Sequence, residues 1–339
     1  MKHYEKFIFL FVIIAMISLA RLMYPGISAL PTLADATAPA SAPVPPHAST
    51  PPLLTLPAMP IAGAGGDAAA NGGAPNAAAD PGGAAGTVFA RTATTPVPTV
   101  TARSYLVADL ATGAVLAGNN TDARWPTASL TKLMTATLIF DQLATSTKIT
   151  ITPQMFSVDP NEYTLAIGGT YTVNGLLHLM LMPSSNVAAE AMADTIGHAQ
   201  FINEMNARAA AWGMTESYFA DTSGISAANQ STAQDLLLLA RHISQNYPGI
   251  LALTDTPAAT IENYATGQRI PVRSINAFAG RSDFIGGKTG NTPQAGANLL
   301  SIFAYHGHPV IIVVLGENTL SSTFTDTERL YSWFRQDFQ

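Results

Sequence analysis

The sequence contains no cysteine. Disulfide bonds, thiol nucleophiles and zinc sites built on cysteine are therefore excluded, although this absence does not by itself fix the cellular compartment. Charge is also scarce, because only 11% of the residues are charged, against about a quarter in a typical globular protein. The formal net charge is −6. This acidic balance gives no indication of nucleic-acid binding, so we expect no nucleic-acid partner.

Charge is scarcest in residues 25–100, which are rich in alanine, proline, glycine, serine and threonine. The charged residues of this stretch are Asp35, Asp67, Asp80 and Arg91. A segment of this composition cannot bury a hydrophobic core, so we predict a disordered linker. A flexible chain of that length has an end-to-end distance of roughly 50 Å. Such a linker would hold a folded domain away from a membrane surface.

The N-terminus carries the one long apolar run, from Phe7 to Ala20, which follows Lys2 and Lys6. The two lysines place this end in the cytoplasm. The run is short for a membrane span, but Phe7 to Tyr24 would cross a bilayer if Arg21 extends its charge to the surface. No small-x-small cleavage site directly follows it. We predict that residues 1–24 are an uncleaved signal anchor, with a cleaved signal peptide as the alternative, and that the rest is extracytoplasmic.

Residues 101–339 have the patterns of a folded domain. The alternating and apolar segments predict strands at 104–110, 114–117, 148–152, 283–289, 297–304 and 309–315. The helical patterns cover residues 128–143, 173–182, 187–196, 201–212, 232–244 and 323–338. Strands at both ends with helices between them predict an α+β fold. We expect one antiparallel sheet flanked by helices, with the central helices packed as a separate lobe.

A candidate nucleophile stands at the start of the first predicted helix. Pro126 suits a helix entry and Thr127 can act as its cap. Ser129 and Lys132 are three positions apart, which places both on one helical face. Ser129 would lie in the first turn, where free backbone N–H groups favour developing negative charge. A serine there with an amine within reach has what an activated nucleophile needs, although this motif alone is weak.

Two further motifs follow in order and strengthen that interpretation. They are Ser184-Ser-Asn186, between two predicted helices, and Lys288-Thr-Gly290, on a predicted strand. No histidine lies near any of the three motifs, so a Ser-His-Asp arrangement has no candidate base, and His306-Gly-His308 is typical of a hairpin turn. Lys132 is then the candidate base, which requires burial and a nearby cation to lower its pKa from about 10.4.

The ordered set S-x-x-K, S-x-N and K-T-G resembles the signature of the penicillin-recognising serine enzymes. Further stretches, such as Asp221-Thr-Ser-Gly-Ile225 and Gly286-Gly-Lys-Thr-Gly290, are similar to the low-molecular-mass penicillin-binding proteins. Within these the chain most resembles the D-alanyl-D-alanine carboxypeptidases and their endopeptidase relatives, over residues 101 to 320. The resemblance implies a β-lactamase/transpeptidase-like fold, no cofactor and no metal.

The resemblance also implies a role for each matching residue. Ser129 would form the acyl-enzyme, Lys132 would be the base and Ser184 would relay protons to the leaving group. Among the substrate-binding residues, Asn186 would hold the amide, and Lys288 and Thr289 would bind the terminal carboxylate. Asn291, just past Gly290, would complete the set. Its backbone N–H would form an oxyanion hole with that of Ser129. The implied partners are peptidoglycan stem peptides ending in D-Ala-D-Ala, β-lactam antibiotics as covalent inhibitors, and the cytoplasmic membrane.

Three departures from the family pattern leave substrate preference open. Ser185 stands where glycine or aspartate is commoner, Val187 where aspartate is frequent, and Asn291 where an aromatic residue or histidine is frequent. A D,D-endopeptidase is therefore an alternative to a carboxypeptidase. A class A β-lactamase would need an E-x-x-L-N motif, which is absent between Asn186 and Lys288. A non-catalytic wall-binding module with the same cleft is a further alternative.

Overall fold

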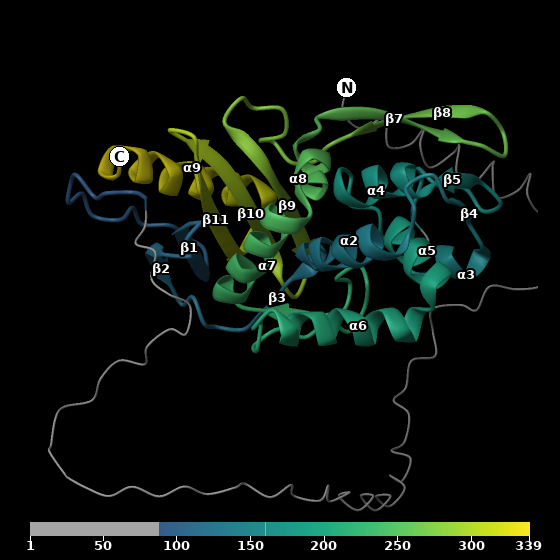
Figure 1. The fold of residues 1–339 in the computed structure, drawn as a ribbon, viewed down its shortest axis with the longest axis horizontal. Coiled ribbons are helices and arrows are strands. Elements are labelled where there is room, and N and C mark those ends of the chain that lie inside the picture. The colour runs from purple at the N-terminus through teal and green to yellow at the C-terminus, as the bar shows by residue number, and fades with distance from the viewer. Residues whose placement is uncertain (1–87, 160) are drawn as a thin grey trace, which may run out of the picture. The chain divides into compact units, whose positions relative to one another are not determined.

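The computed structural model describes residues 88–159 and 161–339. The predicted anchor and most of the predicted linker lie outside these residues. The described part is built on a five-stranded antiparallel sheet with strand order β2-β1-β11-β10-β9. The strands are β1 (Ser104–Asp109), β2 (Val115–Asn119), β9 (Phe284–Thr292), β10 (Gly296–Tyr305) and β11 (His308–Glu317). Segments from both ends of the domain therefore complete one sheet, as the sequence predicted (Figure 1).

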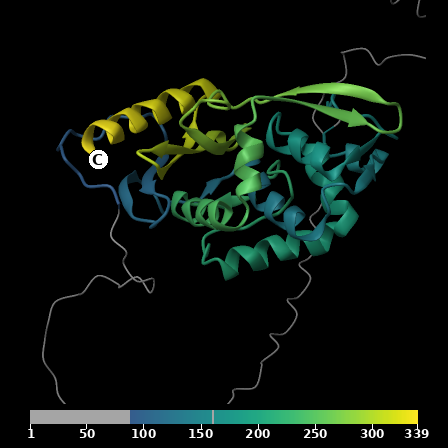
Figure 2. The same ribbon diagram turned by 45° about the horizontal axis from the view of Figure 1, so that its top comes forward.

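The two faces of the sheet are separated by the strand periodicity of two. Val107, Ile312 and Val314 belong to one buried cluster, which also holds the apolar side of the terminal helix α9 (Leu320–Asp337). Their neighbours Leu106, Ile311 and Val313 belong to a second cluster that extends into the helices. Since successive strand residues point to opposite faces, both faces are covered, and Figure 2 shows α9 lying along one of them.

The helical lobe is built around a helix that is buried on nearly every side. A 3₁₀ turn, η1 (Ala128–Leu130), leads into α2 (Thr131–Gln142), whose residues from Thr131 to Ile139 are all buried. The other helices are α3 (Pro153–Phe156), α4 (Val173–Leu181), α5 (Asn186–Ile196), α6 (His198–Ala211), α7 (Ala233–Asn246) and α8 (Pro248–Asp255). A helix surrounded in this way is a rigid place for a functional residue.

Short strand pairs lie outside the five-stranded sheet. They are β3 (Trp125–Pro126) with β6 (Gln230–Ser231), β4 (Lys148–Thr150) with β5 (Thr170–Thr172), and β7 (Ala258–Asn263) with β8 (Gln268–Arg273). The β7–β8 hairpin extends over α4 and β5 (Figure 1). The sequence analysis assigns no element to residues 245–282, where α8 and this hairpin lie.

The predicted helix cap at Thr127 is wrong. Thr127 makes no capping bond, because its hydroxyl pairs with Thr131 Oγ1 at 2.8 Å and the chain turns through η1 before α2 begins. Helix α4 is capped by Thr172, whose Oγ1 accepts from the Gly175 N–H at 3.1 Å. The predicted turn at His306 and Gly307 is confirmed, with φ of 50° and 82° between β10 and β11.

The predicted linker extends too far toward the C-terminus. Residues 88–100 pack against α9 rather than standing free. Phe89 is 3% exposed and its ring lies edge-on to Phe334 at 4.9 Å. Arg91 pairs with buried Asp337 at 2.9 Å. The folded part therefore begins before Thr101. This segment supplies Phe89 and Arg91 as partners of α9, although the alanine- and proline-rich composition around them is typical of a linker.

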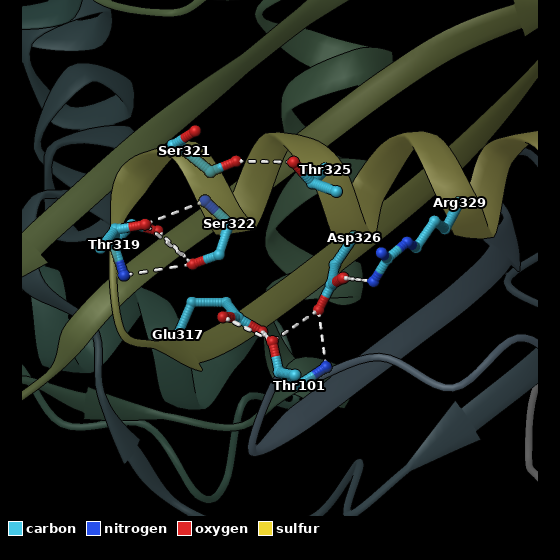
Figure 3. Close-up of polar contacts among 8 residues, drawn as sticks. All are labelled: Thr101, Glu317, Thr319, Ser321, Ser322, Thr325, Asp326 and Arg329. Carbon is cyan, nitrogen blue, oxygen red and sulfur yellow. Dashed lines mark hydrogen bonds and ion pairs between the residues drawn. The ribbon is translucent and has the colours of Figure 1, made fainter.

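Thr101 fixes the entry of this segment into the sheet (Figure 3). Its backbone N–H donates to Asp326 Oδ2 at 2.7 Å, and its hydroxyl lies 2.9 Å from Glu317 Oε1. Glu317 ends β11 and Asp326 lies in α9, whose N-terminus is capped by Thr319. The contact therefore ties the N-terminal segment to both layers.

Within residues 88–159 and 161–339, no helix has the length and hydrophobicity needed to cross a membrane.

Candidate active site

The chain around Ser129 is held from two sides. The Thr127 N–H donates to Asn229 O at 2.9 Å, which continues the β3–β6 pairing. From the sheet side, Asn298 Nδ2 donates to Pro126 O at 2.9 Å and to Thr127 O at 3.1 Å. Asn298 is fully buried in β10. The turn that carries Ser129 is thus positioned by backbone and amide contacts from both the helical lobe and the sheet.

The turn itself has an unusual backbone. Ala128, immediately before Ser129, has φ of 47°, a left-handed conformation that costs a residue with a Cβ about 1–2 kcal/mol. Gly224 packs directly against it, and a Cβ on Gly224 would lie 1.8 Å from Ala128 O. Only glycine fits there. Ser184 is also left-handed, with φ of 71°. Backbone strain is therefore held just before the first motif and within the second, which is typical of functional sites.

Lys132 joins three segments of the site. Its Nζ lies 2.8 Å from Ser129 Oγ, 2.7 Å from Asn186 Oδ1 and 2.8 Å from Ser223 O. The side chain is fully buried. Burial is the main reason that the pKa of Lys132 falls to about 7, and the negative charges of Asp221 and Asp159 oppose this fall. A lysine with such a pKa is substantially neutral near neutral pH and can accept a proton.

The loop from Asp221 to Asn229 holds the Ser223 carbonyl against Lys132. Asp221 Oδ1 accepts from the backbone N–H groups of Ser223 at 2.9 Å and Gly224 at 2.5 Å. Its Oδ2 accepts from Ser226 N at 2.7 Å and from Asn229 Nδ2 at 2.8 Å. One carboxylate thus organises the whole loop. The sequence analysis noted this stretch for its resemblance but gave none of its residues a role.

The second lysine lies on β9. Lys288 Nζ donates to Ser184 Oγ at 2.9 Å and to Thr289 O at 3.0 Å. The side chain is 1% exposed. Burial lowers the pKa of Lys288 well below its ordinary value, and the nearby positive charge of Lys132 lowers it further. Lys288 thus joins strand β9 to the second motif.

Strand β9 approaches the Ser129 turn closely at Gly290. A Cβ on Gly290 would lie 2.9 Å from Thr127 O and 3.1 Å from Ser129 N. A side chain at this position would push the strand away from the nucleophile. Thr289 is buried next to Lys288, and Asn291 is exposed where its backbone pairs with Ala297 of β10. Glycine in the third motif thus permits the contact between the sheet edge and the helix start.

The second motif is fixed by a loop that the sequence analysis did not single out. Asn186 Nδ2 donates to Asp159 Oδ2 at 3.0 Å. Ser185, the cap of α5, makes a short hydrogen bond to Glu162 Oε2. A cavity of about 110 Å³ lies between this loop and residues 183–185. A larger cavity, about 670 Å³, lies between residues 95–98 and α9, among none of the motif residues.

One group among the described residues has the spacing of metal ligands. His198 Nδ1 lies 2.8 Å from Glu190 Oε1 and 3.8 Å from Asp194 Oδ1. The three side chains form an ion-pair cluster at the junction of α5 and α6. Thr222 Oγ1 donates to Glu190 Oε2 at 3.1 Å, which connects the cluster to the loop behind Lys132. None of the three belongs to the motifs.

Comparison with known proteins agrees with this geometry. The peptidase S11 family model, described as D-alanyl-D-alanine carboxypeptidase, matches residues 90–319. The chain belongs to this family. The resemblance predicted from the three motifs is therefore confirmed, and the match begins at residue 90, within the stretch that the sequence analysis assigned to the linker.

Two curated relatives from Escherichia coli K12 show the range of the family. The chain is 31% identical to D-alanyl-D-alanine carboxypeptidase DacC over 263 residues, which covers 73% of this chain and 64% of that protein. It is 33% identical to a D-alanyl-D-alanine endopeptidase over 249 residues, which covers 70% of this chain and 78% of that protein. The chain thus matches somewhat less than two thirds of DacC.

Solved structures support the predicted fold. The Streptomyces K15 DD-transpeptidase superimposes with a TM-score of 0.66 and 28% identity, covering 71% of this chain and all of that one (100%). The Mycobacterium tuberculosis H37Rv D-alanyl-D-alanine carboxypeptidase gives a TM-score of 0.66 with 26% identity and covers 72% and 94% of the two chains. The α+β, transpeptidase-like fold is confirmed.

Proposed function

We propose that this protein is a serine-type D-alanyl-D-alanine carboxypeptidase that acts on peptidoglycan stem peptides through an acyl-enzyme at Ser129. The observation that carries the proposal is the contact of Ser129 Oγ with Lys132 Nζ at 2.8 Å, in a site where burial lowers the pKa of Lys132 to about 7. This pair has the geometry of a nucleophile and its base. Family membership supplies the substrate class.

The hydrogen-bond partners of Lys132 define how the pair would react. A neutral amine has two N–H donors and one lone pair. Asn186 Oδ1 and Ser223 O can only accept, so they take both donors. The lone pair then faces Ser129 Oγ and receives its proton. Ser129 Oγ would attack the carbonyl carbon of the penultimate D-Ala, and the proton would pass through Ser184 to the leaving amine of the terminal D-Ala.

The opposite wall of the cleft would bind the substrate terminus. Lys288 and Thr289 face the region of Ser184, where an anionic carboxylate would find a cation and a hydroxyl. The backbone N–H groups of Ser129 and Asn291 would hold the oxyanion, because β9 lies against the Ser129 turn at Gly290. Water would then hydrolyse the acyl-enzyme. A β-lactam would acylate the same serine and act as a covalent inhibitor.

Labelling with a fluorescent penicillin tests this proposal. We expect one covalent adduct, located at Ser129 by mass spectrometry of peptides, and none in Ser129→Ala. Release of D-Ala from a monomeric pentapeptide should disappear in the same variant. Folded wild-type protein that forms no adduct would instead be a wall-binding module, and rapid release of hydrolysed penicillin would identify a β-lactamase.

A D,D-endopeptidase is the second candidate function. It is favoured by the relative of that name, of which the chain covers 78% at 33% identity. Both reactions break a bond next to a D-Ala carbonyl, so the catalytic residues would be the same. Parallel assays of a monomeric pentapeptide and a cross-linked peptide dimer distinguish them. Preference for the dimer by about tenfold or more in kcat/KM would establish the endopeptidase.

The predicted location is also a proposal. Lys2, Lys6 and the apolar run from Phe7 to Ala20 support an N-terminal anchor in the cytoplasmic membrane, with the domain outside it. Protease added to spheroplasts should release a soluble fragment that begins within residues 25–100. Full protection of the domain in intact spheroplasts would refute this location.

A further inference from the structure

We propose that Asp159 is a positioning residue that fixes the orientation of the Asn186 amide and, through it, directs the lone pair of Lys132 at Ser129. The inference rests on the proposed acylation of Ser129 by way of Lys132. Asp159 follows α3 and lies outside the three motifs.

The first step is the direction of the Asn186 amide. Asp159 Oδ2 lies 3.0 Å from Asn186 Nδ2, and an ionised carboxylate can only accept. The amide N–H must therefore point to Asp159. The amide oxygen then faces the other way, where it lies 2.7 Å from Lys132 Nζ. A flipped amide would place two donors against each other on one side and two acceptors on the other.

The second step passes from Asn186 to Lys132. Because Asn186 presents an oxygen, it accepts one N–H of the amine, and Ser223 O accepts the second at 2.8 Å. The remaining lone pair points to Ser129. If the amide turned over, its N–H would donate to the amine and compete with the Ser129 hydroxyl for the lone pair. Asp159 thus acts on the nucleophile through two intervening side chains.

Asp159 is held within its loop, because its backbone carbonyl accepts from the Glu162 N–H at 3.1 Å and its Oδ1 accepts from the Asn161 N–H at 3.2 Å. Glu162 Oε2 accepts a short hydrogen bond from Ser185, and Glu162 Oε1 accepts from the Thr164 N–H at 2.7 Å. The residue that follows Asn186 cannot take over this role, because Val187 is an apolar residue buried in the core. Ser185, one departure from the family pattern, therefore pairs with a carboxylate of this loop, and Asp159 supplies a second carboxylate to Asn186.

Because Asp159 carries a negative charge, its role can be measured through the pKa of Lys132. The charged groups that act on the pKa of Lys132 are Asp221 from the loop after α6 and Asp159 from the loop after α3. Lys132 in turn lowers the pKa of Lys288 on β9. The negative charge of Asp159 raises the pKa of Lys132. Removing that charge should lower the pKa, so the neutral amine should persist to lower pH.

Two substitutions separate the charge from the orientation. Asp159→Asn removes the charge and can still accept from Asn186 through its own amide oxygen. We expect the pH midpoint of penicillin acylation to move down by about half a unit or more, with a plateau rate within about threefold of wild type. Asp159→Ala removes the acceptor as well, so the plateau should fall by about tenfold or more. Glu262→Gln, at an exposed position on β7, changes the net charge equally and should alter neither quantity.

Titration of Lys132 in the free, full-length protein provides a readout that does not depend on acylation. The ¹³C NMR signal of the side chain, in protein labelled with ¹³C-lysine and assigned by its loss in Lys132→Arg, reports the protonation midpoint. The inference predicts a lower midpoint in Asp159→Asn than in wild type or Glu262→Gln. An unchanged NMR midpoint in Asp159→Asn, or a wild-type plateau in folded Asp159→Ala, would overturn it. Wild-type protein that is not acylated at all would instead refute the proposed function.

Discussion

The site has a helical wall that carries Lys132 and a strand wall that carries Lys288. Both lysines are buried, but the charges near them differ. Lys132, on the helical wall, lies near the carboxylates of Asp221 and Asp159, which oppose the effect of burial and leave its pKa at about 7. Lys288, on the strand wall, has Ser184 and Thr289 as partners and the cation of Lys132 nearby. Burial lowers the pKa of Lys288 well below its ordinary value, and the charge of Lys132 lowers it further. The comparison teaches that the sign of the nearby charges, as well as burial, sets the pKa of a buried lysine.

This difference has a consequence for substrate binding. The helical wall is balanced by the protein's own carboxylates, whereas the strand wall lacks such a partner in the contacts of Lys288. The carboxylate of a D-Ala terminus would supply the missing negative charge. We therefore expect Lys288 to become charged when an anionic substrate binds.

The largest expected effect is loss of acylation in Lys132→Arg. The guanidinium keeps a positive charge but cannot lose its proton, so it cannot act as the base. The rate of penicillin acylation should fall by about 10³-fold or more, while in wild type it should rise with pH through about 7, as Lys132 loses its proton. Stopped-flow measurement with a fluorescent penicillin gives both quantities. Lys148→Arg, on β4, is the matched control. A near wild-type rate in Lys132→Arg would make Lys132 an electrostatic support only.

The next effect concerns carboxylate recognition by Lys288. We expect Lys288→Ala to weaken binding of peptides with a free terminal carboxylate by about 10- to 100-fold, which corresponds to roughly 1.5–3 kcal/mol for a charge-assisted hydrogen bond. Amidated peptides should lose much less. Competition against penicillin labelling measures both affinities. Equal losses for the two peptides would show that Lys288 does not read the carboxylate.

Stability should depend on pH because both lysines have lowered pKa values in the folded state. Between about pH 7 and 10, the unfolded chain binds more protons than the folded one, so the free energy of unfolding should rise with pH. Each lysine contributes about 1.4 kcal/mol per pH unit in this window. Lys132→Met should remove one such contribution, whereas Lys148→Met, an exposed lysine, should not. Urea unfolding at several pH values measures the slope, and a slope unaltered in Lys132→Met would contradict the lowered pKa.

The smallest effect is proton uptake on ligand binding. A peptide with a terminal carboxylate should raise the pKa of Lys288 and draw a fraction of one proton from solution at neutral pH. Calorimetry of Ser129→Ala in two buffers of different ionisation enthalpy measures this uptake, and the amidated peptide should show less. Equal uptake for the two peptides would place the titrating group elsewhere.

Much of this protein could be predicted because its determinants are local. The spacing of Ser129 and Lys132 places both on one helical turn, and the contact at 2.8 Å confirms it. The turn at His306 and Gly307, and the continuous apolar runs of β10 and β11, likewise depend on neighbouring residues. The order of the three motifs was sufficient for the family, which the comparisons confirm.

Other features depend on residues that are distant in the sequence, so only the tertiary structure decided them. The contact of Asn186 with Asp159 joins residues 27 positions apart, and that of Lys288 with Ser184 joins residues 104 apart. The left-handed Ala128 is imposed by packing against Gly224 rather than by its own preference. The pKa of each lysine is set by desolvation and by charges from several segments. Local sequence therefore determined which chemical groups are present. Packing determined which of these groups can exchange a proton, because electrostatic energy depends on distance in space and on the exclusion of water.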